Sequence, residues 1–227
     1  VAARVARPLD FLVISDHAEG LGLMFQVYEG NPAFTQDPIL AGWHKAMKEG
    51  GKAAADAAND VTSRQAQNTL PAPIKDPKIV GPVMKSVWQQ YTATAEKYND
   101  PGRFTAMIGY EWTSVPGGNN LHRNVMFRDG KASADQVFPF SSWNSEDPQK
   151  LWEWMAQYET RTGGRLLAIP HNGNLSNGRM FELTDFSGQP LTRDYAERRA
   201  RWEVLQEGVQ TKGNSETHPT LAPNDEF

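Results

Sequence analysis

The chain has 227 residues and no cysteine, and its 23 Lys and Arg against 27 Asp and Glu give a formal net charge of -4. This length allows one domain with a sizeable core, and the mild negative charge argues against nucleic acid as a partner, because phosphate-binding surfaces are strongly basic. Without cysteine, a metal ion would have to be bound by His, Asp, Glu or water. No apolar run approaches the roughly 20 residues that span a bilayer, so we expect no membrane span.

The first predicted strand covers residues 11–14, a continuous apolar run that is typical of a strand buried on both faces of a parallel sheet. Asp16, His17 and Glu19 follow it directly. Ligands bind beyond the carboxyl ends of such strands, which makes His17 the first candidate site residue. We expect Asp16 to face the opposite side and to orient a ligand, and Glu19 to cap the following turn.

Residues 30–82 are polar and poor in large apolar side chains, which predicts a helical insertion that buries little surface. One interpretation is a lid or arm at the site, and the other is a surface helix with a flexible linker. His44, on a polar helix face in this segment, is interpreted as a structural residue. The following residues, 81–102, predict a helix that ends at Asp100-Pro101.

Residues 104–110 predict a second strand, which ends on Glu111. A loop rich in Pro and Gly follows, and another strand-like run begins beside His122. If the two strands pair as a hairpin, the end of the first lies beside the start of the second. Glu111 and His122 would then share one rim of the sheet.

The last third of the chain repeats this arrangement. A helix with apolar residues at helical spacing is predicted over 149–164, with Gly163 and Gly164 at its C-terminal end. Strands are predicted over 165–170, ending on His171, and over 202–206, ending on Glu207. The alternation of strands and helices favours an α/β layered or barrel fold.

Two polar loops follow these strands. The first contains Asn172, Asn174 and Asn177 with two glycines, and it is either a binding loop for an anionic group or a tight turn in solvent. The second contains Lys212, a candidate phosphate contact, and His218. The alternative for the second loop is a polar surface segment without a role.

Four predicted strand ends and one strand start thus carry ionisable side chains, and these form the candidate metal site: His17, Glu111, His122, His171 and Glu207. A His and carboxylate set without Cys suits Zn, Mn or Fe. Two such ions about 4 Å apart can bind both the attacking and the leaving oxygens of a phosphate ester.

Five segments carry a resemblance to a known family: "LDFLVISDHAE", "MIGYEWT", "HRNVMF", "IPHNGN" and "EVLQEGVQTKGNSETHP". In this order they resemble motifs of the PHP (polymerase and histidinol phosphatase) superfamily. More closely, they are similar to a bacterial PHP-like family of unknown function, domain-of-unknown-function family 3604. The resemblance covers nearly the whole chain except the insertion.

The resemblance implies a distorted β/α barrel of seven strands with a site for two or three divalent metal ions. It implies that His17, Glu111, His122 and His171 are metal ligands and that Glu207 and His218 lie near the site. The His-x-His strand that opens such domains and the Asp-x-His strand that closes them do not occur here. Since the chain begins with Val1 and stops without a closing element, we expect a partial PHP-like domain over 1–227, with both strands outside it.

These observations together predict a metal-dependent hydrolase, most specifically a phosphoesterase with a small-molecule substrate. His17, His171 and His218 are the candidate catalytic residues, and Asn172, Asn174 and Lys212 are the candidate substrate contacts. The alternatives are a PHP-like binding module without catalysis and a metal-dependent hydrolase of amides or lactones. The sequence fixes neither the oligomeric state nor the compartment, although the resemblance favours the cell envelope or periplasm.

Overall fold

The computed structural model describes residues 6–67 and 69–215, which form two units. The first unit contains residues up to Glu19 and from Tyr91 onwards, and the second contains residues 20–90. Helix α6 (Pro77–Tyr98) crosses the boundary between them. The predicted mixed α/β class is confirmed, but the described residues form small sheets and no closed barrel.

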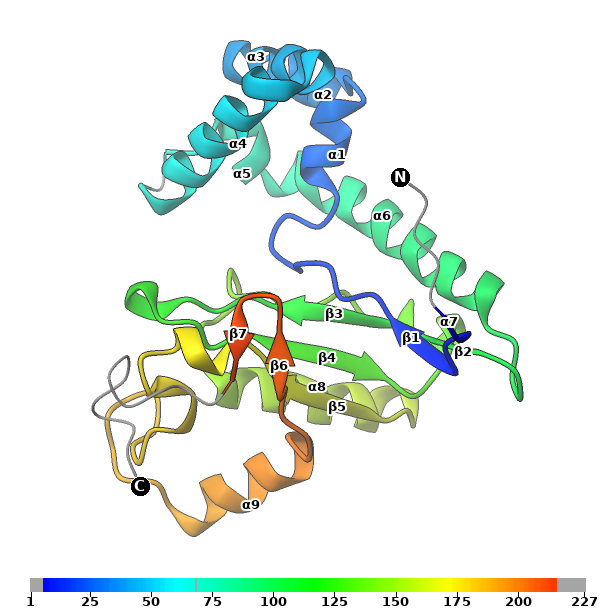
Figure 1. The fold of residues 1–227 in the computed structure, drawn as a ribbon, viewed down its shortest axis with the longest axis vertical. Coiled ribbons are helices and arrows are strands. Elements are labelled where there is room, and N and C mark those ends of the chain that lie inside the picture. The colour runs from blue at the N-terminus through cyan, green and yellow to red at the C-terminus, as the bar shows by residue number, and fades with distance from the viewer. Residues whose placement is uncertain (1–5, 68, 216–227) are drawn as a thin grey trace. The chain divides into compact units, whose positions relative to one another are not determined.

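The central sheet of the first unit is antiparallel. It consists of β3 (Gly109–Trp112), β4 (Arg123–Phe127) and β5 (Leu166–Pro170), in that order (Figure 1). The predicted hairpin is confirmed, because β3 pairs with β4 in a register that places Glu111 opposite Asn124. In antiparallel strands the carboxyl end of one lies beside the amino end of the next. The end of β3, the start of β4 and the end of β5 therefore share one edge.

Helix α8 (Pro148–Thr162) packs against this sheet through aromatic contacts. The ring of Tyr158 lies 5.2 Å from that of Phe127 on β4, and both side chains are buried. The helix begins at the Asp147 cap, whose carboxylate accepts a hydrogen bond from Gln149 N, and ends at Gly163 with φ of 71°. These local signals explain why the sequence predicted this helix correctly.

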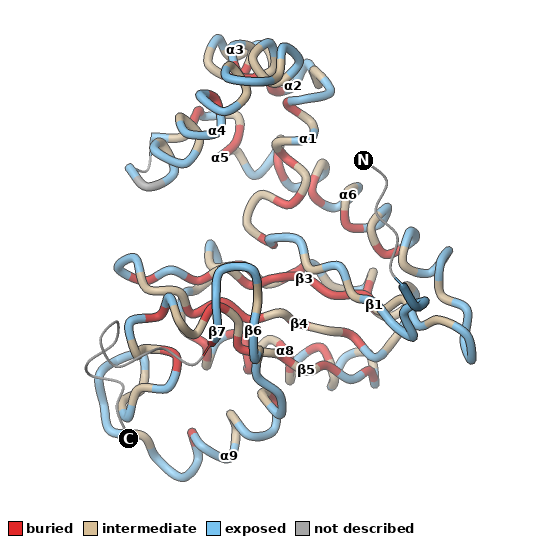
Figure 2. The backbone as a smooth tube through the Cα atoms, in the orientation of Figure 1, coloured by how far each residue is buried: buried red, intermediate tan, exposed pale blue. Residues whose placement is uncertain are grey.

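The first predicted strand is exposed, contrary to the expectation of burial on both faces. It forms β1 (Phe11–Val13), which pairs in parallel with β2 (Thr105–Met107), and Phe11 is 62% exposed. Leu12 and Ile14 line an open apolar groove of 450 Å³ beside α6. Apolar composition alone predicted burial, whereas burial also needs a covering layer, and β1 contains only exposed and intermediate residues (Figure 2).

The strand predicted over 104–110 is in fact two strands. It is interrupted at Ile108, so that β2 pairs with β1 and β3 pairs with β4. Gly109 permits this change of partner, because a Cβ at this position would lie 2.5 Å from Val13 Cγ2 and 2.9 Å from Val125 O. The absence of a side chain lets β1 and β4 approach the same point of the backbone.

The prediction of a strand over 202–206 is wrong. Helix α9 (Arg193–Trp202) begins at the Thr192 cap and is supported by ion pairs at helical spacing, including Arg193 with Glu197. Residues 203–208 then have no regular structure, and Val204 is 62% exposed. Glu207 consequently follows a helix and a connecting segment, and not a strand.

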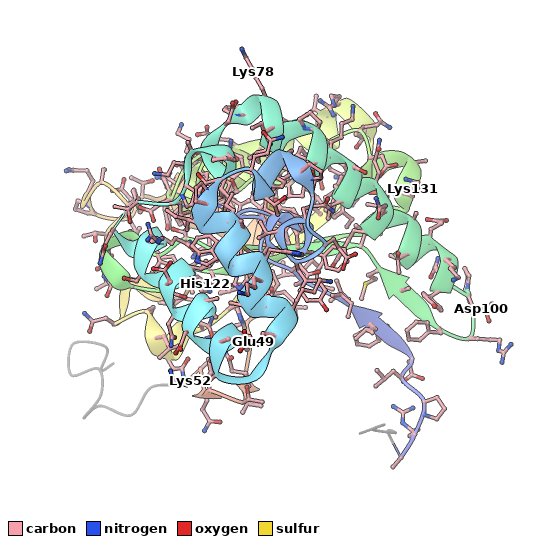
Figure 3. The ribbon with its side chains drawn as sticks, turned by 90° about the horizontal axis from the view of Figure 1, so that it is seen from above. Glu49, Lys52, Lys78, Asp100, His122 and Lys131 are labelled. Carbon is pink, nitrogen blue, oxygen red and sulfur yellow. The ribbon has the colours of Figure 1, made fainter. Side chains whose placement is uncertain are left out.

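Short elements complete the first unit. Lys131 of helix α7 reaches the hydroxyl group of Thr92 on α6 (Figure 3). The remaining elements are α7 (Lys131–Ala134), the 3₁₀ turns η1 (Pro116–Gly118), η2 (Gly173–Leu175) and η3 (Arg179–Phe181), and the strands β6 (Val209–Gln210) and β7 (Gly213–Asn214).

The second unit is helical throughout its described part. Its elements are α1 (Leu23–Tyr28), α2 (Pro32–Thr35), α3 (Pro38–Glu49), α4 (Gly51–Ala66), α5 (Ala72–Lys75) and the first part of α6. Phe34, Leu40 and Trp43 are buried, so this unit has an apolar core of its own. Lys78, near the start of α6, extends into solvent (Figure 3). The predicted helical content of 30–82 is therefore present, whereas its role as a lid stays a prediction.

Candidate metal centre

Main-chain hydrogen bonds bring the predicted site residues together at the shared edge of the central sheet. Ala18 N donates to Glu111 O at 2.8 Å, which places His17 beside Glu111. His171 N donates to His122 O at 2.9 Å, and Glu207 N donates to Pro170 O at 3.2 Å. Five residues from four distant segments thus become neighbours, because each segment is attached to the next by its backbone.

Glu111, His122 and His171 form a group whose potential ligand atoms all lie within 4.8 Å of one another. Glu111 Oε1 lies 2.8 Å from His122 Nδ1, and Glu111 Oε2 lies 3.9 Å from His171 Nε2. The side chains of Glu111 and His122 are each 9% exposed. One carboxylate and two imidazoles at these separations match the donor set of a transition-metal site.

The charge state of Glu111 suits this role. Burial raises the pKa of its carboxyl group, but the hydrogen bond to His122 and the charges of the three neighbouring histidines lower it more, so the pKa lies below its usual range. An ionised carboxylate beside imidazoles is the form that binds a cation.

The ring of His122 provides a test of whether the residues fit a metal ion. His122 Nε2 is buried and has no hydrogen-bond partner among the described residues. A buried polar atom without a partner costs free energy, and a bound cation is one group that would remove this cost. The donor set and this ring nitrogen are therefore compatible with a divalent metal.

Glu207 lies behind His171. Glu207 Oε1 is 2.7 Å from His171 Nδ1, while Oε2 accepts hydrogen bonds from Asn172 N at 3.0 Å and Gln210 Nε2 at 2.9 Å. Burial raises the pKa of Glu207, but these hydrogen bonds and the charge of His171 hold it below its usual value. A carboxylate on Nδ1 orients the ring so that Nε2 is available, which is a common arrangement around metal ligands.

His17 is placed differently from the other two histidines. Its Nδ1 atom lies 3.7 Å from Glu111 Oε1, but its side chain is 63% exposed and it is not part of the group of three. Glu19 was predicted to cap the turn that follows it. Its carboxylate instead accepts hydrogen bonds from Thr113 N and Ser142 N. Its carboxylate thereby holds two loops near the site through their backbone N–H groups.

The predicted substrate contacts differ in their surroundings. Asn172 is 1% exposed, and its amide group already contacts His122 Nδ1 and Gln210 Nε2. Its φ of 60° is a conformation that Asn tolerates better than most residues. Asn174 Nδ2 donates to Lys212 O at 3.2 Å, and the Lys212 side chain is exposed. His218 lies outside the described residues.

Thr113, Gln210 and Ser215 contact the site residues but were not identified from the sequence. Thr113 Oγ1 contacts both His17 and Glu111, and Ser215 Oγ donates to Glu207 at 3.3 Å. The spacing of Thr113 two positions after Glu111 is a usable signal, because alternate residues of a strand share a face. Gln210 and Ser215 carry no such signal, since they follow an irregular segment.

The fold and the site define a mixed α/β protein with a His and carboxylate cluster at one edge of an antiparallel sheet. Over residues 1–227 the chain matches the family described as "Protein of unknown function (DUF3604)", and it belongs to this family. No curated protein and no solved structure matches the chain. In the described part of the chain, no helix has the length and apolar character that crossing a membrane requires.

Proposed function

We propose that this protein is a metal-dependent hydrolase of the PHP type that acts on phosphoesters. The observation that carries the proposal is the group of Glu111, His122 and His171 with its ligand atoms within 4.8 Å. The order of the sequence motifs supports the PHP assignment and, with it, a distorted β/α barrel. Zn, Mn or Fe fits the nitrogen and oxygen donors.

Glu111, His122 and His171 would hold a divalent ion, with His17 as a further donor on the exposed side. When bound, the ion supplies Lewis acidity and neutralises negative charge on a phosphoryl group. Glu207 keeps the His171 ring in a fixed orientation through Nδ1. The buried amide nitrogen Nδ2 of Asn172 lies 3.0 Å from His122 Nδ1 and helps to hold this ring in place.

The substrate would approach from the side of His17, the most exposed imidazole of the cluster. Neutral His17 is suited to act there as a ligand of the ion, because its ring lies near Glu111 and is open to solvent. Lys212 and Asn174, which are joined by a hydrogen bond between their loops, are proposed as contacts for the phosphate oxygens.

Metal analysis of the purified protein, followed by assays with p-nitrophenyl phosphate and its bis ester, tests this proposal. We expect bound Zn, Mn or Fe, hydrolysis of at least one ester, and loss of both after chelation. Bound metal with hydrolysis of amide or lactone substrates alone would favour a carbonyl hydrolase. If the purified protein contains no metal and does not bind metal that is added to it, this would contradict the metal centre and favour a binding module.

A further inference from the structure

A hydroxyl group lies between His17 and Glu111. Thr113 Oγ1 is 2.5 Å from His17 Nδ1 and 3.4 Å from Glu111 Oε1. The first distance is that of a short hydrogen bond and the second is that of a long one. Thr113 is therefore the one described side chain with hydrogen bonds to both of these residues.

The backbone of Thr113 is held in place independently of its hydroxyl group. Thr113 N lies 3.3 and 3.2 Å from the two carboxylate oxygens of Glu19. Glu19 Oε1 also accepts a hydrogen bond from Ser142 N at 2.5 Å. Because the main chain is fixed from this side, a change of the Thr113 side chain need not displace the loop.

The hydrogen-bonding roles follow from the chemistry of the three groups. A hydroxyl group has one proton to donate, and an ionised carboxylate can only accept. If Thr113 Oγ1 donates to Glu111, its lone pairs must accept from His17, so the proton of the neutral imidazole lies on Nδ1. The position of Glu111 Oε1, 3.7 Å from His17 Nδ1, favours the same arrangement, because an N–H faces a carboxylate more favourably than a lone pair does.

We propose that Thr113 is a positioning residue that fixes neutral His17 as its Nδ1–H tautomer. The lone pair of His17 then lies on Nε2, the nitrogen that is not turned toward Thr113. Since the side chain is 63% exposed, this lone pair is available to an ion or to a reacting group. That this lone pair binds an ion rests on the proposed metal centre, whereas the tautomer of His17 does not depend on that proposal.

Nitrogen-15 NMR of the histidine-labelled full chain without metal tests the proposal. Spectra are recorded at about pH 8, where most imidazoles are neutral, and His17→Gln assigns the signals. We expect the wild type and Thr113→Ser to show protonated Nδ1 at His17, because serine keeps the hydroxyl group. Thr113→Val should lose this preference. A wild-type spectrum with protonated Nε2 would overturn the proposal even if the valine variant did not fold, and so would an unchanged tautomer in folded Thr113→Val.

Titration with Mn²⁺ alone separates this proposal from the metal centre. Removal of a side chain that hydrogen-bonds to a metal-binding residue typically weakens metal affinity by about 10- to 100-fold. We expect a loss in this range for Thr113→Val and near-wild-type affinity for Thr113→Ser. Equal affinity of the valine and serine variants would contradict the positioning role. Absence of Mn²⁺ binding by the wild type would contradict the metal centre and leave the NMR result to decide the tautomer.

Discussion

His171 and His44 are both hydrogen-bonded through Nδ1, but their second nitrogens have different surroundings. His171 Nδ1 contacts the Glu207 carboxylate, and its Nε2 lies 3.9 Å from Glu111 Oε2. His44 Nδ1 lies 2.9 Å from Val27 O and 3.0 Å from Tyr28 O, and no described carboxylate forms an ion pair with the ring. A fixed ring is therefore not enough to define a metal ligand, because a ligand also needs further donors around its free nitrogen.

The contacts of His44 also show what this residue contributes to the second unit. His44 lies on α3, and its Nδ1 contacts the carbonyl oxygens of Val27 and Tyr28 at the end of α1, where helix carbonyl groups lack partners within the helix. Gly30 makes room for this contact, because a Cβ there would lie 3.0 Å from His44 Cε1. The role of His44 is thus structural, as its sequence context indicated.

The largest effect should come from removing His171. We expect His171→Ala to weaken Mn²⁺ binding by at least about 100-fold, because one of three clustered donors is lost. His44→Ala, the matched control, should keep the wild-type affinity. Calorimetric titration of the three proteins measures this, and equal affinities throughout would place the metal elsewhere.

Glu207→Gln should have a smaller effect on the same measurement. Glutamine keeps the shape of the side chain but removes the charge that orients the His171 ring, so we expect about 10- to 100-fold weaker Mn²⁺ binding. The control is Glu153→Gln, which changes an exposed carboxylate on α8 that pairs with Lys150. A loss as complete as that of His171→Ala would indicate that Glu207 binds the ion directly.

Gly30→Ala tests the structural side of the comparison. Gly30 has φ of 76°, so alanine would be strained, and its Cβ would press on His44. We expect a loss of roughly 1–3 kcal/mol in the free energy of unfolding, with Mn²⁺ affinity unchanged. Gly42→Ala, within α3 and with no atom within 4 Å of the added Cβ, should leave stability unchanged or raise it. Chemical denaturation measures both variants, and equal stabilities would remove the strain argument.

The smallest effect is expected on the surface of the second unit. Lys52 and Asp56 form an exposed ion pair one turn apart on α4, with a separation of 2.7 Å. Because exposed pairs of this kind are weak, Lys52→Met should change the free energy of unfolding by no more than about 0.5 kcal/mol. A larger loss in the same denaturation experiment would mean that α4 depends on its surface charges more than on packing.

Part of the site could be predicted from the sequence because it depends on local order. Glu111 and His122 flank a loop rich in Pro and Gly between two apolar strands, and a hairpin brings such positions together whatever surrounds it. His171 follows an apolar strand in the same way. Glu207 was also identified, but for a wrong reason, since the strand expected before it is the end of α9 and an irregular segment.

The sequence by itself determined the kinds of donor available, the hairpin and the capped helix α8, because turn residues, caps and periodicity act over a few neighbouring positions. The tertiary structure decided that β1 is exposed, that the central sheet is antiparallel, and which ring nitrogens of His17, His122 and His171 face a carboxylate. Glu207 and His171 are 36 positions apart, and Thr113 and His17 are 96 apart. Contacts over such separations depend on how whole segments pack, and short-range pattern carries no information about that packing.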